Sequence, residues 1–279
     1  MNCKQIFLLA CSLGLIIFST TGFSRPQRIV SLNLCADQLL MELLPPQQLV
    51  GITQMATNPD ISYSYEKAKK YHTHSGRTEE IIALQPDLIV AGQFTSSTTN
   101  QLLEQLGYSV IKIGLPRTIL DVFQQIKKLA QQVNAKHQAE ALITNMQGAQ
   151  KNLLQAQSSH PLPRAAVYYA NGYSAGKNTI THEILNLAGY SNIAAEYGLT
   201  TVAPFSLEKL LASRPEILIF GHFQDNQASL AHQLLQHTAI QTLITSHHVK
   251  TITMPDRYWN CAGPSSIAAA QYLAGLHSL

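Results

Sequence analysis

Short apolar runs alternate along this chain with longer stretches whose apolar residues recur every three or four positions. The short runs predict buried parallel strands, and the spaced stretches predict helices that cover them. In the first half, strands are expected at residues 28–32, 49–53, 88–91 and 109–113. Because helices are expected between them, the pattern indicates an α/β domain with a parallel sheet wrapped by helices.

Two helices and one long loop complete the first half. Residues 33–37 turn into a helix that Pro45 and Pro46 end, and a second helix is expected near 96–106. Residues 54–77 are polar, contain several tyrosines and predict a loop.

Residues 79–92 and 208–221 repeat one pattern 129 positions apart. Each copy has Glu, Ala, Pro, an acidic residue and Gly at equivalent positions. The pattern predicts a helix that Pro ends, followed by a buried strand that ends at Gly. The chain therefore carries two similar α/β lobes, and we expect the functional site between them.

The rest of the second half follows the same alternation. It predicts a strand at 164–169, a Gly-rich turn at 171–177 and a helix at 181–188. After the second repeat copy, a strand is expected at 249–254 and a final helix at 264–276.

A long helical stretch separates the two halves. Residues 118–157 keep helical spacing throughout, with a break expected at 134–135. The second of these helices has about 20 residues and would span about 30 Å, enough to connect two lobes. The expected division is a first lobe at 25–135, a linking helix at 136–160 and a second lobe at 161–279. A helical link would limit how far the lobes move.

The chain begins with features of an export signal. Lys4 precedes a 13-residue apolar stretch at 6–18, and small residues follow up to Ser24. The stretch is shorter than the roughly 18 residues that a membrane span needs. We expect a signal peptide at 1–24 and a soluble periplasmic product, and we favour this over lipid attachment at Cys11.

The charge of the chain argues against a polyanionic partner. Lys and Arg number 19 and Asp and Glu 16, for a formal net charge of +3, and no block of like charge occurs. Nucleic-acid binding and stable membrane binding are therefore not expected.

Four motifs resemble one known family: residues 28–32, 84–90, 176–192 and 257–264. They are similar to the periplasmic substrate-binding proteins of metal-chelate ABC importers, which carry cobalamin, ferric siderophores or heme. The resemblance implies two Rossmann-like α/β lobes joined by a single long α-helix, with ligand bound between them. It also implies a monomer without enzymatic activity or cofactor, whose partners are the chelate and an inner-membrane ABC permease with its ATPase.

The family docks onto its permease through one glutamate on each lobe. The matching residues here are Glu79 and Glu208, the first residues of the two repeat copies. A plain alternative is that both favour the start of a helix because of its dipole. Their equivalent positions in the two lobes favour docking.

The ligand is expected at the carboxyl ends of the strands, where loops enter helices. Aromatic faces would grip a planar ligand, and Arg257 could pair with a carboxylate or phosphate. Tyr173 matches an aromatic position of the cobalamin-binding members, whereas Cys261 stands where they carry an arginine. Core packing or a surface position is the alternative for each tyrosine, and a surface salt bridge is the alternative for Arg257. The expected ligand-binding residues are Asn33, Cys35, Asp37, Tyr63, His74, Tyr173, Arg257, Tyr258, Trp259 and Cys261.

Two cysteines, Cys35 and Cys261, remain after removal of the signal. They could be separate thiols near the ligand, a disulfide that ties the lobes together, or soft ligands for a metal. We favour separate thiols.

Two other functions are compatible with parts of the sequence. His72, His74 and His222 could serve a receptor for a free metal ion such as zinc. Residues 172–176 match Gly-x-Ser-x-Gly, which would make Ser174 the nucleophile of a secreted serine hydrolase. The helix that this motif requires starts several residues late, so we favour a binding protein.

Overall fold

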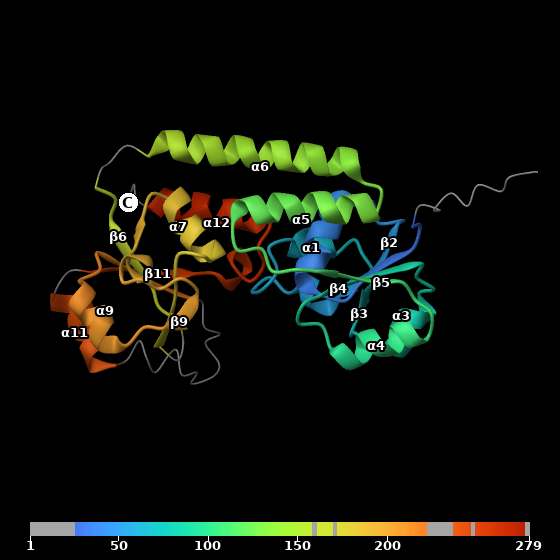
Figure 1. The fold of residues 1–279 in the computed structure, drawn as a ribbon, viewed down its shortest axis with the longest axis horizontal. Coiled ribbons are helices and arrows are strands. Elements are labelled where there is room, and N and C mark those ends of the chain that lie inside the picture. Colours follow the sequence, from blue (N-terminus) through green and yellow to red (C-terminus); the bar gives the residue numbers. More distant parts are fainter. Residues whose placement is uncertain (1–25, 158–160, 170–171, 222–236, 247–248, 277–279) are drawn as a thin grey trace, which may run out of the picture.

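The computed structural model describes residues 26–276 except 158–160, 170–171, 222–236 and 247–248. The chain forms two α/β lobes, and helix α6 (Lys136–Ala156) runs along both of them (Figure 1). The predicted signal peptide lies outside the described residues. Among the described residues, no helix has the length and apolar character needed to cross a membrane.

The first lobe contains a five-stranded parallel sheet with the strand order β3-β2-β1-β4-β5. Four of its strands lie where the apolar runs predict them, and the short β3 falls within the expected loop at 54–77. The strands are β1 (Ile29–Ser31), β2 (Leu49–Thr53), β3 (Thr73–His74), β4 (Leu88–Gly92) and β5 (Val110–Ile113).

Helices connect these strands and begin at well-defined caps. The Asn33 side chain accepts hydrogen bonds from the backbone of Cys35 and Ala36 and so caps α1, while Thr118 and Asp121 form a capping box for α5. Two short helices also occupy the expected loop at 54–77. The helices are α1 (Leu34–Leu43), η1 (Gln54–Thr57), α2 (Tyr65–Ala68), α3 (Thr78–Ala83), α4 (Ser97–Gln105) and α5 (Ile119–Gln132).

The second lobe repeats the order of the first. Its four-stranded parallel sheet has the order β11-β10-β6-β8, equivalent to β5-β4-β1-β2. An antiparallel pair, β7 and β9, is added beside it, so part of the expected turn at 171–177 is a strand. The strands are β6 (Arg164–Val167), β7 (Tyr173–Ala175), β8 (Ser191–Asn192), β9 (Val202–Pro204), β10 (Ile217–Gly221) and β11 (Lys250–Met254).

The helices of the second lobe follow the same alternation, and the predicted helices at 181–188 and 264–276 are confirmed within a few residues. The helices are α7 (Ile180–Leu187), α8 (Ile193–Glu196), α9 (Leu207–Ser213), α11 (Thr238–Ser246), η3 (Asp256–Tyr258) and α12 (Pro264–Gly275).

The internal repeat extends to the backbone conformation. Gln85 and Arg214, 129 positions apart, both adopt a positive φ of 48° within two residues of the end of a helix. In each case the next residue is Pro86 or Pro215, which cannot continue the helix. The repeated sequence therefore encodes one helix-to-strand turn twice, as the sequence predicts.

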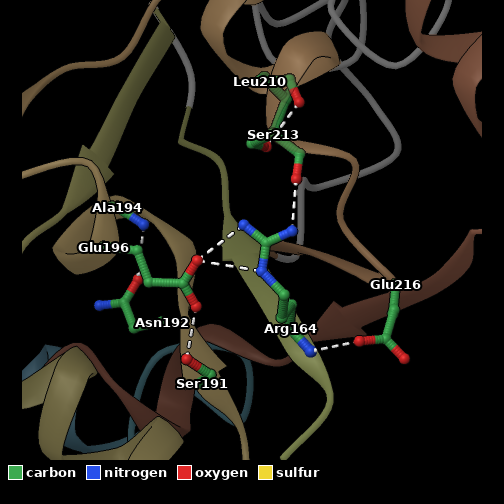
Figure 2. Close-up of polar contacts among 8 residues, drawn as sticks. All are labelled: Arg164, Ser191, Asn192, Ala194, Glu196, Leu210, Ser213 and Glu216. Carbon is green, nitrogen blue, oxygen red and sulfur yellow. Dashed lines mark hydrogen bonds and ion pairs between the residues drawn. The ribbon is translucent and has the colours of Figure 1, made fainter.

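An arginine stabilises each of these turns, and Figure 2 shows the one in the second lobe. At the start of β6, Arg164 donates from Nη1 to the Ser213 carbonyl at 2.7 Å and from its backbone N–H to Glu216 at 2.9 Å. Its guanidinium also pairs with Glu196 at 2.7 Å.

The first lobe has the same arrangement at the start of β1. Arg28 donates from Nη2 to the Leu84 carbonyl at 2.6 Å, and its backbone N–H donates to Asp87 at 3.1 Å. Leu84 and Asp87 are the repeat equivalents of Ser213 and Glu216. The contacts lie at the amino ends of the strands, opposite the edge where a ligand is expected.

One hydrophobic core runs through both lobes. It includes residues of the two sheets together with α6, which buries Ala139, Ile143 and Met146, and α12. The break between α5 and α6 occurs at Asn134, whose φ is 52°. The lobes are thus packed together and not only tethered, although the exact lobe boundaries stay a prediction.

Candidate functional site

The order of the strands marks the expected crevice. In the first sheet the order reverses between β1 and β4, and in the second between β6 and β10. Ligands of open α/β sheets bind outside the carboxyl ends of strands at such points. Gly92 ends β4 so close to Asn33 that any side chain at position 92 would collide with it. Thr95 ties the loop after β4 to the Leu32 carbonyl at 3.3 Å.

Two of the predicted loops meet at the junction of the lobes. The Arg257 backbone N–H donates to the Asp60 carbonyl at 3.0 Å. The Asn260 side chain donates to the Ile61 carbonyl at 3.3 Å. Residues 256–261 of the second lobe therefore lie against residues of the predicted first-lobe loop.

Cys35 and Cys261 form a disulfide at this junction, with their Cα atoms 5.2 Å apart. The prediction of separate thiols is wrong, because the fold brings two loops 226 positions apart in the chain to within disulfide range. The metal-ligand alternative also fails, since sulfurs in a disulfide are not thiolates. Both residues connect the lobes and provide no free thiol to a ligand.

Aromatic side chains gather around the same junction. The ring centroids of Tyr63 and Tyr258 are 5.8 Å apart, and Trp259 meets Tyr169 edge to face at 6.5 Å. Tyr258 also stacks on Tyr272 of α12 at 5.2 Å. Three of the predicted ligand-binding residues, Tyr63, Tyr258 and Trp259, are therefore brought together by the fold.

Arg257 is half-buried beside this cluster. Its guanidinium lies 5.4 Å from the centre of the Tyr258 ring and donates from Nη1 to the Pro59 carbonyl at 3.3 Å. The contact with the ring orients the planar guanidinium. The remaining N–H groups leave Arg257 able to meet an anionic group of a ligand.

Tyr173 lies on β7 and is 40 % exposed. Its strand pairs with β9, where Val202 is 54 % exposed. The structure thus makes Tyr173 accessible, as a ligand contact requires. Tyr173 also pairs with Tyr169, whose backbone N–H donates to the Tyr173 carbonyl at 2.9 Å and whose ring meets Trp259.

Asp37 lies beneath the site and is fully buried. Its carboxyl group accepts hydrogen bonds from the Thr53 backbone N–H at 3.2 Å and from the Thr53 hydroxyl at 2.5 Å. Burial raises the pKa of this carboxyl to about 7, because water no longer solvates the charge. Asp37 joins α1 to the end of β2 and is fully buried in this structure, and its expected ligand contact stays a prediction.

The side chains of His74 and Asn33 are also held by hydrogen bonds within the protein. His74 is 2 % exposed, with Nε2 2.9 Å from the Ser31 carbonyl and Nδ1 accepting from the Gly76 N–H at 3.1 Å. Both ring nitrogens are therefore used, and burial lowers the pKa of the ring. Asn33 is engaged as the cap of α1. The expected ligand contacts of His74 and Asn33 stay predictions.

Two exposed apolar residues were missed by sequence reasoning. Phe94, 78 % exposed, follows β4, and Met55, 52 % exposed, follows β2. Both stand at carboxyl ends of strands, which is the signal that could have identified them. Large apolar side chains left exposed at such an edge are typical of a binding surface.

The geometry removes the hydrolase alternative. Ser174 is fully buried in β7, and its hydroxyl donates to the Val167 carbonyl at 2.6 Å. A nucleophilic serine needs an exposed hydroxyl on a sharp turn between a strand and a helix. The Gly-x-Ser-x-Gly match therefore lacks the exposed turn between a strand and a helix that a nucleophilic serine needs.

The described residues give no support to a receptor for a free metal ion. In these ranges, no group of three His, Cys, Asp or Glu side chains is placed to hold a metal. His74 is buried and fully hydrogen-bonded, and His222 lies outside the described residues.

Glu79 and Glu208 lie in the first turns of α3 and α9 and are exposed. Figure 1 shows these helices in different lobes, both on the side away from α6. A hydrogen bond from Ser206 lowers the pKa of Glu208, so it is ionised at neutral pH. Neither glutamate takes part in an ion pair within the described part of the chain.

Known proteins of similar sequence are binding proteins and not enzymes. A vitamin B12-binding protein of Pectobacterium atrosepticum is 25 % identical over 279 residues, covering 96 % of this chain and 94 % of that protein. A cobalamin-binding protein of Halobacterium salinarum is 25 % identical over 227 residues, covering 80 % of this chain. The alignment spans only 62 % of the Halobacterium protein.

Solved structures share the fold. The periplasmic heme-binding protein HutB of Vibrio cholerae superposes with a TM-score of 0.74 at 21 % identity, over 91 % of this chain and 99 % of that one. The periplasmic heme-binding protein RhuT of Roseiflexus, in apo form, gives 0.71 at 22 % identity, over 89 % and 96 %. The sequence model of the periplasmic binding protein family matches residues 29–258. With two duplicated lobes, a linking helix and this match over most of its length, the chain belongs to the periplasmic binding protein family.

Proposed function

We propose that this protein binds a metal chelate between its lobes and delivers it to an inner-membrane ABC permease. The ligand class is cobalamin or a related corrinoid, heme or a ferric siderophore. The signal segment at 1–24 would be cleaved, leaving a monomer that works in the periplasm. Membership in the periplasmic binding protein family supports the general role.

The observation that carries the proposal is the aromatic cluster at the junction of the lobes. Tyr63, which is 39 % exposed, comes from the first lobe, and the half-buried Tyr258 and Trp259 come from the second. The ring centroids of Tyr63 and Tyr258 are 5.8 Å apart, and the Trp259 ring lies 6.5 Å from that of Tyr169. Rigid aromatic faces suit a large ligand with a planar ring or chelate surface. Arg257 beside them suits a carboxylate or phosphate at the edge of such a ligand.

Cobalamin is the first ligand to test, because the Pectobacterium and Halobacterium relatives are named for it. By the resemblance, Cys261 stands where the cobalamin-binding members carry an arginine, and here it is held in a disulfide. The chain therefore lacks that cationic group and offers Arg257 instead. Heme and siderophores carry carboxylates or other anionic edges that Arg257 could also meet.

Trp259 is the only tryptophan of the chain and gives a direct test. Purified mature protein is titrated with cobalamin, heme, several ferric siderophores and Zn²⁺, following Trp259 emission with correction for absorption by the ligand. We expect saturable quenching by one chelate, and a weaker affinity after Tyr173→Ala. Tyr197→Ala, which removes a tyrosine of similar exposure (43 %) from the same lobe, should bind as the parent does. If no chelate changes the Trp259 emission and Zn²⁺ changes it saturably, the result would support the metal-ion receptor instead.

Docking would use the two exposed glutamates. Glu79 and Glu208 occupy equivalent places in duplicated lobes, which suits docking onto basic residues of the permease. Unpaired exposed carboxylates also steer association with a basic surface at little cost in stability.

A further inference from the structure

Residues 256–261 belong to the second lobe in sequence but are bound to the first. They contact residues 59–63 through hydrogen bonds and an aromatic pair, and they contain Cys261, which is bonded to Cys35. We call residues 256–261, together with residues 59–63 and Cys35, the clasp. The chain otherwise passes between the lobes at α6.

The first-lobe end of the clasp is rigid. Cys35 lies in the first turn of α1, which Asn33 caps. Two residues further on, Asp37 is fully buried and binds the end of β2 through Thr53. Cys35 therefore cannot move without the sheet of the first lobe.

The second-lobe end is equally fixed. Cys261 is 4 % exposed, and its carbonyl accepts a hydrogen bond from the Ser265 hydroxyl in α12 at 2.7 Å. Along α12, the Leu273 carbonyl accepts from the buried Tyr190 hydroxyl at 3.1 Å. The disulfide therefore joins two well-packed bodies and not two loose loops.

The non-covalent part of the clasp is weaker. The side-chain hydrogen bonds from Arg257 and Asn260 to first-lobe carbonyls are 3.3 Å long and lie in exposed surroundings. Water can replace such bonds at small net cost. These contacts can break and re-form, whereas the disulfide cannot open without reduction.

We propose that the Cys35–Cys261 disulfide fixes the separation of the two lobes and so holds the aromatic site of the clasp preformed. Its reduction leaves the shared core, α6 and the non-covalent contacts of the clasp to hold the lobes, so that their separation varies more. In that step a dithiol reductant supplies two electrons and two protons, the S–S bond becomes two thiols, and the reductant becomes a disulfide. The inference concerns lobe geometry, so it can fail or hold whichever ligand the protein binds.

Pulsed electron-electron double resonance tests the inference directly. Nitroxide labels are attached to p-acetylphenylalanine at positions 70 and 209, which are exposed and lie in different lobes. This chemistry leaves cysteines untouched. In the oxidised mature protein we expect one narrow distance distribution. After reduction and alkylation of the folded protein, or in Cys35→Ser/Cys261→Ser, we expect a broader distribution with a component at longer distance.

Two controls make the result specific. Asn260→Ala removes a hydrogen bond of the clasp but leaves the disulfide, so its distribution should stay narrow. Far-UV circular dichroism must show that the reduced protein is still folded, and reduction of the wild type replaces the double variant if that variant does not fold. An unchanged distribution after reduction, broadening in Asn260→Ala alone, or two titratable thiols in protein exported to the periplasm would each overturn the inference.

Discussion

The arginine at the start of the second-lobe sheet offers a quantitative test of how the duplicated turn is stabilised. Arg164→Met keeps the apolar stem of the side chain and removes its three guanidinium hydrogen bonds (Figure 2). The backbone hydrogen bond from Arg164 to Glu216 remains. The variant therefore isolates the contacts with Ser213 and Glu196.

The two contacts differ in expected strength. Ser213 is 2 % exposed, so its carbonyl would lose a charge-assisted hydrogen bond in a place that water reaches poorly, at a cost of about 1.5–3 kcal/mol. The pair with Glu196 is about one third exposed on both sides and should contribute about 0.2–1 kcal/mol. We expect Arg164→Met to lower the free energy of unfolding by about 2–3 kcal/mol, and the melting temperature by roughly 5 °C.

Urea denaturation of a small set of variants measures both parts. Arg28→Met removes the equivalent contacts in the first lobe, to the Leu84 and Gln85 carbonyls. Among the described residues no carboxylate pairs with this guanidinium, and Leu84 is less buried than Ser213, so the loss should be about 1 kcal/mol. A double-mutant cycle of Arg164→Met with Glu196→Gln isolates the ion pair, with an expected coupling of about 0.5 kcal/mol that shrinks in 1 M salt. A loss below about 0.5 kcal/mol for Arg164→Met would refute the reasoning, because it would mean that the buried carbonyl finds another donor at no cost.

Three further outcomes are expected. The pKa of Asp37 is raised to about 7 in the folded protein, so its protonated form adds stability below about pH 4 that is lost as the pH rises to 7. Relative to Asp37→Asn, the wild type should therefore lose up to about 4 kcal/mol over that range in thermal melts. Replacing Cys35 and Cys261 by serine should lower the free energy of unfolding by about 5 kcal/mol, the chain-entropy value for a loop of 226 residues. Glu79→Gln with Glu208→Gln should leave ligand affinity unchanged and reduce uptake in a transport assay.

Each of these has a clear contrary result. A stability difference between wild type and Asp37→Asn that is constant with pH would mean that the carboxyl is already ionised when folded. A loss under 1 kcal/mol on removal of the disulfide would mean that the unfolded chain is not constrained by it. For the docking pair, Glu140→Gln on α6 is the control, and equal uptake by control and double variant would remove the two glutamates from docking.

The lobes and the site make different demands on the sequence. The lobes need only apolar runs of the right length, whereas the site needs particular side chains on one edge of two sheets. This explains why the elements at 88–92 and 217–221 were recognisable and why the loop at 54–77 was not. Buried parallel strands must be almost wholly apolar, but β3 and the short helices of the loop are held by tertiary contacts, such as the pairing of Thr73 with Ile52.

The site shows the same limit residue by residue. Tyr63, Tyr258 and Trp259 were expected to meet, and they do, because their loops follow the carboxyl ends of strands. Asp37 and His74 were drawn into the expected site by the same rule. The rule places a residue at the end of a strand but does not say whether its side chain points into the core. Asp37 and His74 are both buried.

The amino-acid sequence by itself determined the duplication, the α/β class of each lobe, the linking helix and the family. The first three follow from periodicity and from residues such as Pro86 and Pro215 that act on their own neighbours, and the family follows from the resemblance of four motifs to a known group. Only the tertiary structure decided that Cys35 and Cys261 are bonded, that Ser174 is buried and that Phe94 is exposed. Each of these depends on the distance between segments far apart in the chain, and that distance is set by the packing of the two lobes and not by any local pattern.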